Sequence, residues 1–201
     1  MILRDIDRKE IMDKPFIENQ NFQGVDFSTQ PLNRGDYENC TFLNCTLLNL
    51  DLSEINFIEC TFKNCDLSMA KTVKTAFRDV KFSDCKLLGL RFEGRNDFLF
   101  SVDFESCQLN LSSFYKRSLK KTKFKDCVLK EVDFSEADLT NSTFENCDLS
   151  GAIFANSVLE KVDFRTSYNF SIDPEKNRIK KAKFSLPGIP GLLDKYNIEI
   201  E

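Results

Sequence analysis

The chain lacks histidine and tryptophan altogether, and it holds only 7 glycines and 5 prolines in 201 residues. Without histidine, it has neither the commonest general base nor the commonest metal ligand. No window approaches the roughly 18 apolar residues that span a bilayer. The N-terminal stretch MILRDIDRKEIMDK has no uninterrupted apolar run that could serve as a signal peptide. These absences argue against an enzyme and against a membrane protein, and they predict a cytoplasmic location.

Apolar residues recur at every fifth position along most of the chain, and sixteen of the 20 Phe fall on this lattice. Phe or Leu stands at 22, 27, 32, 42, 47, 52, 57, 62, 67, 77, 82, 87 and 92, with Tyr at 37. The series restarts two residues out of phase at 104 and continues to 164, and Phe184 lies on the same lattice. A period of five suits neither an α-helix nor an alternating strand. The chain must therefore turn a corner every five residues.

The cysteines follow the same lattice. All eight lie two residues before a lattice Phe or Leu: Cys40, Cys45, Cys60, Cys65, Cys85, Cys107, Cys127 and Cys147. Positions two apart in an extended backbone face the same way, so the small residue and the large one both point inward. Buried thiols behave as small hydrophobic groups. Parallel inward columns do not converge tetrahedrally as zinc ligands do, and disulfides are rare in a reducing cytoplasm. We predict that the cysteines are core residues and that no metal or cofactor is bound.

The pattern small–polar–Leu/Phe–polar–polar resembles the pentapeptide-repeat family. The stretches ECTFK, NCDLS, EADLT and GAIFA are clear examples, and the resemblance covers roughly residues 20–166. It implies an all-β fold, a right-handed quadrilateral parallel β-helix with four pentapeptides per turn and about eight turns. Residues twenty apart should then stack in columns. We expect an N-terminal cap over 1–16, the β-helix over 17–167, and a last coil, C-terminal cap and dimerisation segment over 168–201.

The C-terminal segment extends the resemblance to the Qnr-like group of this family. That group protects bacterial DNA gyrase and topoisomerase IV from quinolones and is built of paired rods with surfaces proposed to imitate duplex DNA. In LPGIPGLLDKYNIEIE, a short helix over PGLLDKYN and a strand over NIEIE are expected. The resemblance implies a homodimer, and the residues we place at its seam are Ile189, Leu192, Leu193 and Tyr196. In the alternative interpretation, these side chains only plug their own coil.

Charge is distributed in bands along the chain. Residues 22–68 hold seven acidic and two basic side chains, and residues 131–170 hold eight acidic and two basic ones. Between these two acidic bands, residues 116–130 form a basic band with one acidic and seven basic side chains. The basic band should interrupt an imitation of a phosphate backbone. Direct binding of nucleic acid is not expected either, because stacking on bases needs exposed aromatic residues and only Tyr115 is available nearby. We therefore expect a non-enzymatic scaffold, with type II topoisomerase as the leading partner and an unrelated protein as the alternative.

The lattice breaks at EGRNDFLFSVD, where Arg95 and Asp97 fall on inward positions. One turn later, Arg117 occupies the inward small slot before Leu119. Since a buried unpaired Arg would be very costly, we expect the backbone to bulge and turn Arg117 outward. Aromatic and Arg side chains are typical of interface hot spots. The residues of our candidate partner-binding face are Arg95, Phe98, Phe100, Tyr115 and Arg117. A tolerated insertion with a compensating neighbour is the alternative.

Overall fold

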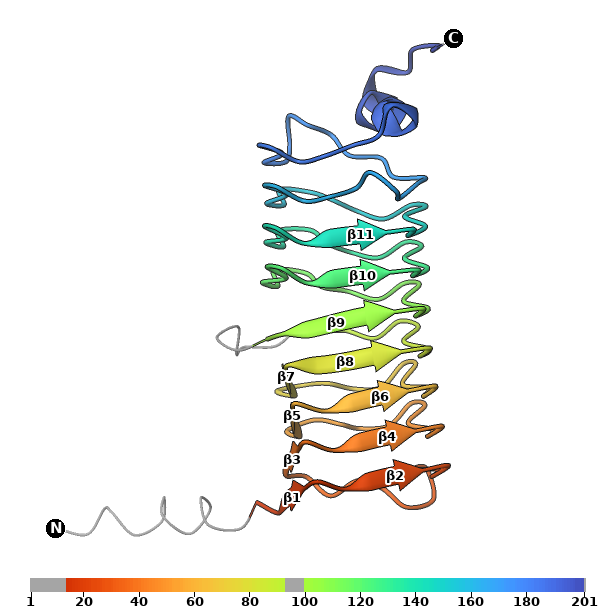
Figure 1. The fold of residues 1–201 in the computed structure, drawn as a ribbon, viewed down its shortest axis with the longest axis vertical. Coiled ribbons are helices and arrows are strands. Elements are labelled where there is room, and N and C mark those ends of the chain that lie inside the picture. Colours follow the sequence, from red (N-terminus) through yellow and green to blue (C-terminus); the bar gives the residue numbers. More distant parts are fainter. Residues whose placement is uncertain (1–13, 93–99, 201) are drawn as a thin grey trace, which may run out of the picture.

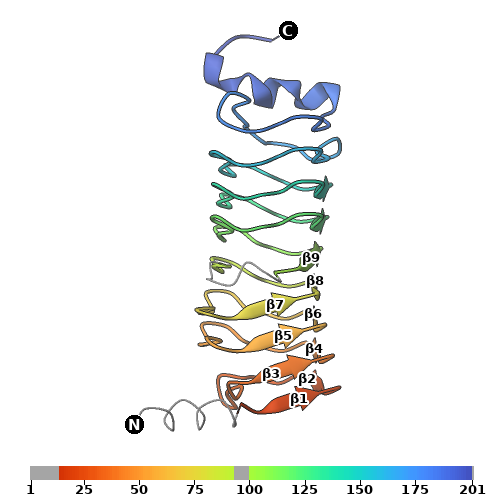
Figure 2. The same ribbon diagram turned by 90° about the vertical axis from the view of Figure 1, so that its left-hand side faces the viewer.

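In the computed structural model, which describes residues 14–92 and 100–200, the chain winds into a rod of stacked coils (Figures 1 and 2). Two parallel sheets form two of its sides. The strands of the first sheet are β1 (Phe16–Glu18), β3 (Asp36–Glu38), β5 (Asn56–Ile58) and β7 (Ala76–Arg78), paired in that order. Those of the second are β2 (Asn21–Gln23), β4 (Thr41–Leu43), β6 (Thr61–Lys63), β8 (Val80–Ser83), β9 (Val102–Glu105), β10 (Lys123–Lys125) and β11 (Thr143–Glu145).

The register confirms the twenty-residue column. Phe42 pairs with Phe62 and Phe62 with Phe82, whereas Phe82 pairs with Phe104, so the insertion adds two residues between β8 and β9. The seven strands of the second sheet span six turns. Single bridges to Asp163 and then Lys183 continue the same column by two further turns. The fold is thus the four-sided parallel β-helix that the resemblance to the pentapeptide-repeat family implies, with residues twenty apart in one column.

Corners are formed by residues in the left-handed backbone region. Asn44, Asn64 and Asp84 stand at one corner on successive coils, with φ of 54°, 52° and 56°. Asn and Asp tolerate this region better than most residues because their short polar side chains bond locally. The Asn64 amide also donates to Asn44 Oδ1 at 2.7 Å, which links one coil to the next. The chain can therefore turn at each corner with little use of glycine.

The core consists of stacked aromatic rings with thiols beside them. Rings in one column lie nearly parallel, as between Phe42 and Phe62, whose centroids are 4.5 Å apart. Rings from neighbouring sides meet edge to face, as between Phe134 and Phe144 at 5.8 Å. All eight cysteines are buried and unbridged, which confirms their placement in the core. Burial raises the pKa of Cys60 to about 11, so this thiol is protonated at neutral pH.

The inward thiols are also hydrogen-bond donors. Each donates to the carbonyl of the inward large residue one coil earlier: Cys65 to Phe42 O at 3.3 Å and Cys85 to Phe62 O at 3.4 Å. Ser157 makes the same bond to Phe134 O, at 2.8 Å. These cysteines and Ser157 therefore add a hydrogen bond to their small volume, whereas Val80, Val102, Ala137 and Ala152 fill the same slot without a side-chain donor.

The C-terminal segment lies across the last coil (Figure 2) as two 3-10 helices, η2 (Leu186–Leu192) and η3 (Asp194–Tyr196). Pro187 stands in the first turn of η2, where its missing amide hydrogen costs little, and Pro190 lies inside the helix. The expected strand over NIEIE is wrong for its described residues: Asn197 takes φ of 48° and residues 197–200 form no strand. Among the described residues, no helix is long and apolar enough to cross a membrane.

Candidate functional site

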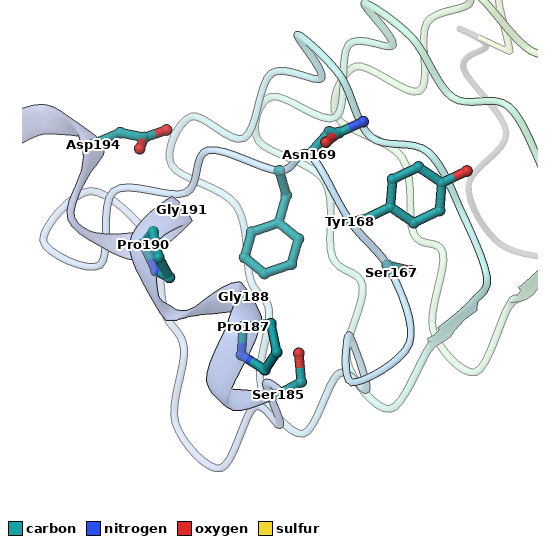
Figure 3. A pocket seen from close by; sticks show the side chains of 10 residues that line it. Ser167, Tyr168, Asn169, Ser185, Pro187, Gly188, Pro190, Gly191 and Asp194 are labelled. Atoms are coloured by element: carbon teal, nitrogen blue, oxygen red, sulfur yellow. The ribbon is translucent and has the colours of Figure 1, made fainter. Parts of the chain in front are cut away.

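The C-terminal helices and the last coil enclose a shallow hollow of about 380 Å³ (Figure 3). Pro187 and Pro190 line it from the helix side, and Tyr168 and Asn169 from the coil side. Among the residues that line it, only Asp194 carries a charge. The lining otherwise consists of hydroxyl, amide, aromatic and Pro–Gly groups.

Two glycines allow η2 to lie directly on the coil. A Cβ on Gly188 would lie 2.8 Å from Phe170 Cζ, and one on Gly191 would lie 2.1 Å from Phe170 O. Gly191 O also accepts a hydrogen bond from Ile172 N at 2.8 Å. Our sequence prediction missed this contact. The repeated Pro–Gly at a spacing of three, which places both glycines on one side of a 3-10 helix, was the available signal.

A polar cluster fastens η3 to the last coil. Lys195 Nζ lies 2.8 Å from Asp173 Oδ1 and 2.7 Å from Glu175 Oε2, and the Tyr196 hydroxyl donates to Glu175 Oε1 at 3.0 Å. Hydrogen bonds from Lys195 lower the pKa of both carboxyl groups. Desolvation by itself would lower the pKa of Lys195, but the two carboxylates raise it overall. The cluster therefore holds η3 while both acids are ionised.

The predicted seam residues do not share one face. Ile189 is 38% exposed and Tyr196 53% exposed, whereas Leu192 packs partly buried against the core of its own coil. Leu193 is half-buried and lines a second shallow hollow with Ile198 and Ile200. The outer surface of the C-terminal segment is thus apolar at Ile189, Leu193 and Tyr196, and Leu192 serves the cap.

Arg117 lies inside the coil, so the prediction that it turns outward is wrong. It is 4% exposed, and its Nε donates to Phe92 O, the carbonyl of the inward large residue one coil earlier. Its guanidinium lies over the Phe100 ring, 4.6 Å from the centroid. Arg117 thus makes the same hydrogen bond as the cysteines, and the longer side chain reaches the ring that follows the insertion. The donor geometry makes an outward bulge unnecessary.

The other four residues of the predicted partner face do not lie together on one exposed surface in the described part of the chain. Arg95 and Phe98 lie outside the described residues. Phe100 is partly buried against the core. Tyr115 points outward as predicted, and its hydroxyl donates to Glu136 Oε1 at 2.9 Å on the next coil. Of the three predicted residues that the structure describes, Phe100 and Arg117 are in contact, and they meet inside the rod.

Carboxylates on neighbouring coils engage several lysines of the basic band. Lys120 lies 3.1 Å from Asp138, Lys125 lies 2.7 Å from Glu105, and Lys130 lies 3.3 Å from Asp148. Burial would raise the pKa of Asp148, but hydrogen bonds from Ser150, Asn169 and Lys130 lower it to about 2. The rod surface in this region alternates in charge along its axis. A continuous negative surface is not present there.

These features define a repeat solenoid with a closed aromatic core and an added C-terminal cap. The family model of the pentapeptide repeat region matches residues 35–96 and 98–168, and the chain belongs to this family. No curated protein matches the chain.

Two solved structures of QnrB1, a plasmid-mediated fluoroquinolone resistance protein, are similar in fold. One trypsin-treated form is 21% identical with a TM-score of 0.50, covering 93% of this chain and 92% of that one. The other is 23% identical with a TM-score of 0.45, covering 93% and 100%. HetL, a protein of heterocyst differentiation regulation from the cyanobacterium Nostoc sp. strain PCC 7120, is 14% identical with a TM-score of 0.32, covering 89% and 92%.

Proposed function

We propose that the protein is a non-enzymatic scaffold that binds another protein through its outer surface. The observation that carries this proposal is the closed interior, where phenylalanine, leucine and thiol columns fill the coil from Tyr37 to Phe170. Among the described residues, no group of three or more acidic or cysteine side chains could hold a metal ion. The chemistry available to such a rod lies in its outward columns, which are long, rigid and charged.

The leading specific partner is a bacterial type II topoisomerase. Support comes from the fold shared with QnrB1, whose described role is fluoroquinolone resistance. The alternating charges across Lys125 and Glu105 or Lys120 and Asp138 favour partial rather than complete imitation of DNA. An unrelated protein partner is the alternative, because the same alternation suits protein surfaces of mixed charge.

A supercoiling assay tests the topoisomerase proposal. Purified gyrase is assayed with increasing amounts of the protein, with and without a quinolone. We expect protection of supercoiling from the drug at micromolar protein. No effect at that concentration removes topoisomerase as the partner and leaves the scaffold proposal with the alternative partner.

We also propose that two rods pair through their C-terminal segments. Leu186, Ile189 and Tyr196 support this pairing, because they are apolar, exposed to solvent and located at the C-terminal end of the rod. Truncation after Ser185 should give monomers in sedimentation equilibrium. Since truncation also uncovers the last coil, Ile189→Glu provides a milder variant, with Ile153→Glu on the side of the rod as its matched control. A monomeric full-length protein, or a dimer that survives Ile189→Glu, would contradict the proposal.

A further inference from the structure

One corner of the rod carries an apolar strip formed by Leu48, Met69, Leu88 and Leu111. Met69 is 60% exposed and Leu111 63% exposed; Leu48 is also exposed and Leu88 is half-buried. The four residues lie on successive coils: Leu48 and Leu88 directly follow the inward Leu column, and Met69 and Leu111 stand one residue further on. Backbone hydrogen bonds stack this corner: Met69 N donates to Leu88 O at 2.8 Å, and Gly89 N donates to Asn110 O at 2.9 Å.

The strip includes two unfavourable backbone conformations. Met69 has φ of 57° and Leu111 φ of 61°, both in the left-handed region. Every other non-glycine residue with positive φ in the described part of the chain is polar or charged. Asn49 stands at the same corner one coil earlier, where its side chain suits this conformation. Folding by itself therefore favours Asn at 69 and 111, and neither strained residue gains burial in return.

Gly89 makes the strip continuous. A Cβ at this position would lie 2.5 Å from Met69 Sδ, so the Met69 side chain extends over Gly89 of the next coil. Any other residue at 89 would push the thioether away. Met is flexible and polarisable, which suits it to surfaces that adapt to a partner.

Two lysines flank the strip. Lys86 precedes Leu88 by two residues and points to the same side of the sheet, and Lys71 follows Met69 by two. Both are exposed, and neither lies in an ion pair with another residue of the ranges 14–92 and 100–200. The nearby Asp66 carboxylate instead accepts a hydrogen bond from Ser68 N at 2.9 Å. Asp51 and Asp66 lie beside Lys71 and Lys86 on the preceding coil, and the charge of Lys71 contributes to lowering the pKa of Asp51. The strip is therefore an apolar line with charges of both signs beside it, and the ammonium groups of the two lysines are outside ion-pair distance of those carboxylates.

We propose that this strip docks the apolar face of an amphipathic helix of a partner protein, with carboxylates of the helix facing Lys71 and Lys86. Coils repeat about every 4.7–4.9 Å along the rod. Residues three or four apart in an α-helix advance by about 4.5–6 Å. A helix parallel to the rod thus presents one apolar side chain per coil. This inference rests on the proposed scaffold function but does not depend on gyrase as the partner.

The test uses a fluorescein-labelled designed helix with Leu on one face and Glu beside it, and a second peptide with Lys in place of Glu. Fluorescence anisotropy measures binding to the full chain and to the variants Met69→Asn and Leu111→Asn. The control is Ile153→Asn, which alters another exposed apolar residue, 50% exposed, elsewhere on the rod. We expect the acidic peptide to bind at least tenfold more tightly than the basic one. Met69→Asn and Leu111→Asn should each weaken binding at least tenfold without lowering the unfolding midpoint.

Several results would overturn the proposal. Equal binding of the two peptides would show that charge complementarity plays no part. Unchanged binding by both Asn variants would show that the peptide does not bind to the strip. Dissociation of a dimer by either variant would assign the strip to a second copy of this chain instead. Failure of the gyrase assay with successful peptide binding leaves this inference standing, whereas peptide failure with gyrase protection refutes this inference alone.

Discussion

The inward small slot and the outward corner show two different kinds of departure from the repeat. Arg117 replaces a small residue inside the coil, yet its Nε donates to Phe92 O just as Cys127 Sγ donates to Phe104 O. Met69 and Leu111 replace polar residues at a corner, and there the backbone conformation becomes less favourable with no gain in burial. Arg117 therefore keeps the hydrogen bond that cysteines make at this position of the repeat. Met69 and Leu111 bring no benefit to the fold, and for this reason we relate them to binding.

Among the variants that test this comparison, Arg117→Ala is expected to lower the free energy of unfolding most. The variant removes a charged donor from Phe92 O and leaves the Phe100 ring uncovered, so we expect a loss of about 2–4 kcal/mol in the free energy of unfolding. Urea denaturation measures it. Arg165→Ala is the control, because this exposed residue pairs only at the surface with Asp163 and should cost about 1 kcal/mol or less. If both variants lost the same amount of free energy of unfolding, Arg117 would not be acting as a buried donor to Phe92 O.

Acid should destabilise the coil at Asp148, whose side chain is largely buried. The pKa of Asp148 is lowered to about 2 from 3.8, so its contribution is present above pH 4 and is lost as the pH falls towards 2. We expect a contribution on the order of 1–2 kcal/mol. Urea denaturation between pH 6 and pH 2 should show a smaller pH dependence in Asp148→Asn than in the unmodified chain. Identical pH profiles would contradict the hydrogen bonds described for this carboxyl group.

Replacement of Cys127 separates volume from hydrogen bonding in the regular slot. Cys127→Ala removes both the sulfur atom and the donor to Phe104 O, and should cost about 1–2 kcal/mol. Cys127→Ser keeps a donor, as Ser157 does at 2.8 Å, and should cost about half as much. Chemical denaturation of both variants provides the measurement. A Ser variant less stable than the Ala variant would show that the slot selects only apolar volume.

The smallest effect is expected at the regular outward positions. Lys120 and Asp138 form an exposed pair between two coils, and Lys120→Ala should change the free energy of unfolding by about 0.5 kcal/mol or less. The thermal midpoint at low and high salt checks this, because salt screens such pairs. A loss comparable with that of Arg117→Ala would mean that surface charge, rather than the core, maintains the coil.

The sequence was sufficient to predict the regular part of the fold. The five-residue period placed Phe42, Phe62 and Phe82 in one column, and the lattice placed the cysteines beside such columns. The orientation of Arg117 was not predictable from burial cost alone. The cost of burying Arg117 is offset by its hydrogen bond to Phe92 O, and only the structure shows that this carbonyl lies beside the Arg117 side chain.

The candidate sites were harder to predict. Leu192 was placed at the seam because the C-terminal segment resembles that of the Qnr-like group, and on η2 it packs partly buried against the core of its own coil. NIEIE alternates as a strand does, yet no strand pairs with residues 197–200. Exposed positions are weakly constrained by the fold, so the apolar residues Met69 and Leu111 stood out only once their backbone angles were known.

Hydrogen exchange at the Arg117 Nε–H group tests the central claim that Arg117 fills the inward small slot as a buried donor to Phe92 O. In NMR spectra at neutral pH, this proton should exchange at least a thousandfold more slowly than that of Arg165, which is exposed, because it is buried and bonded to Phe92 O. Arg117→Lys, with its different donor geometry, should remove the resonance and lower stability. An Arg117 Nε–H that exchanges as fast as that of Arg165 would contradict the account.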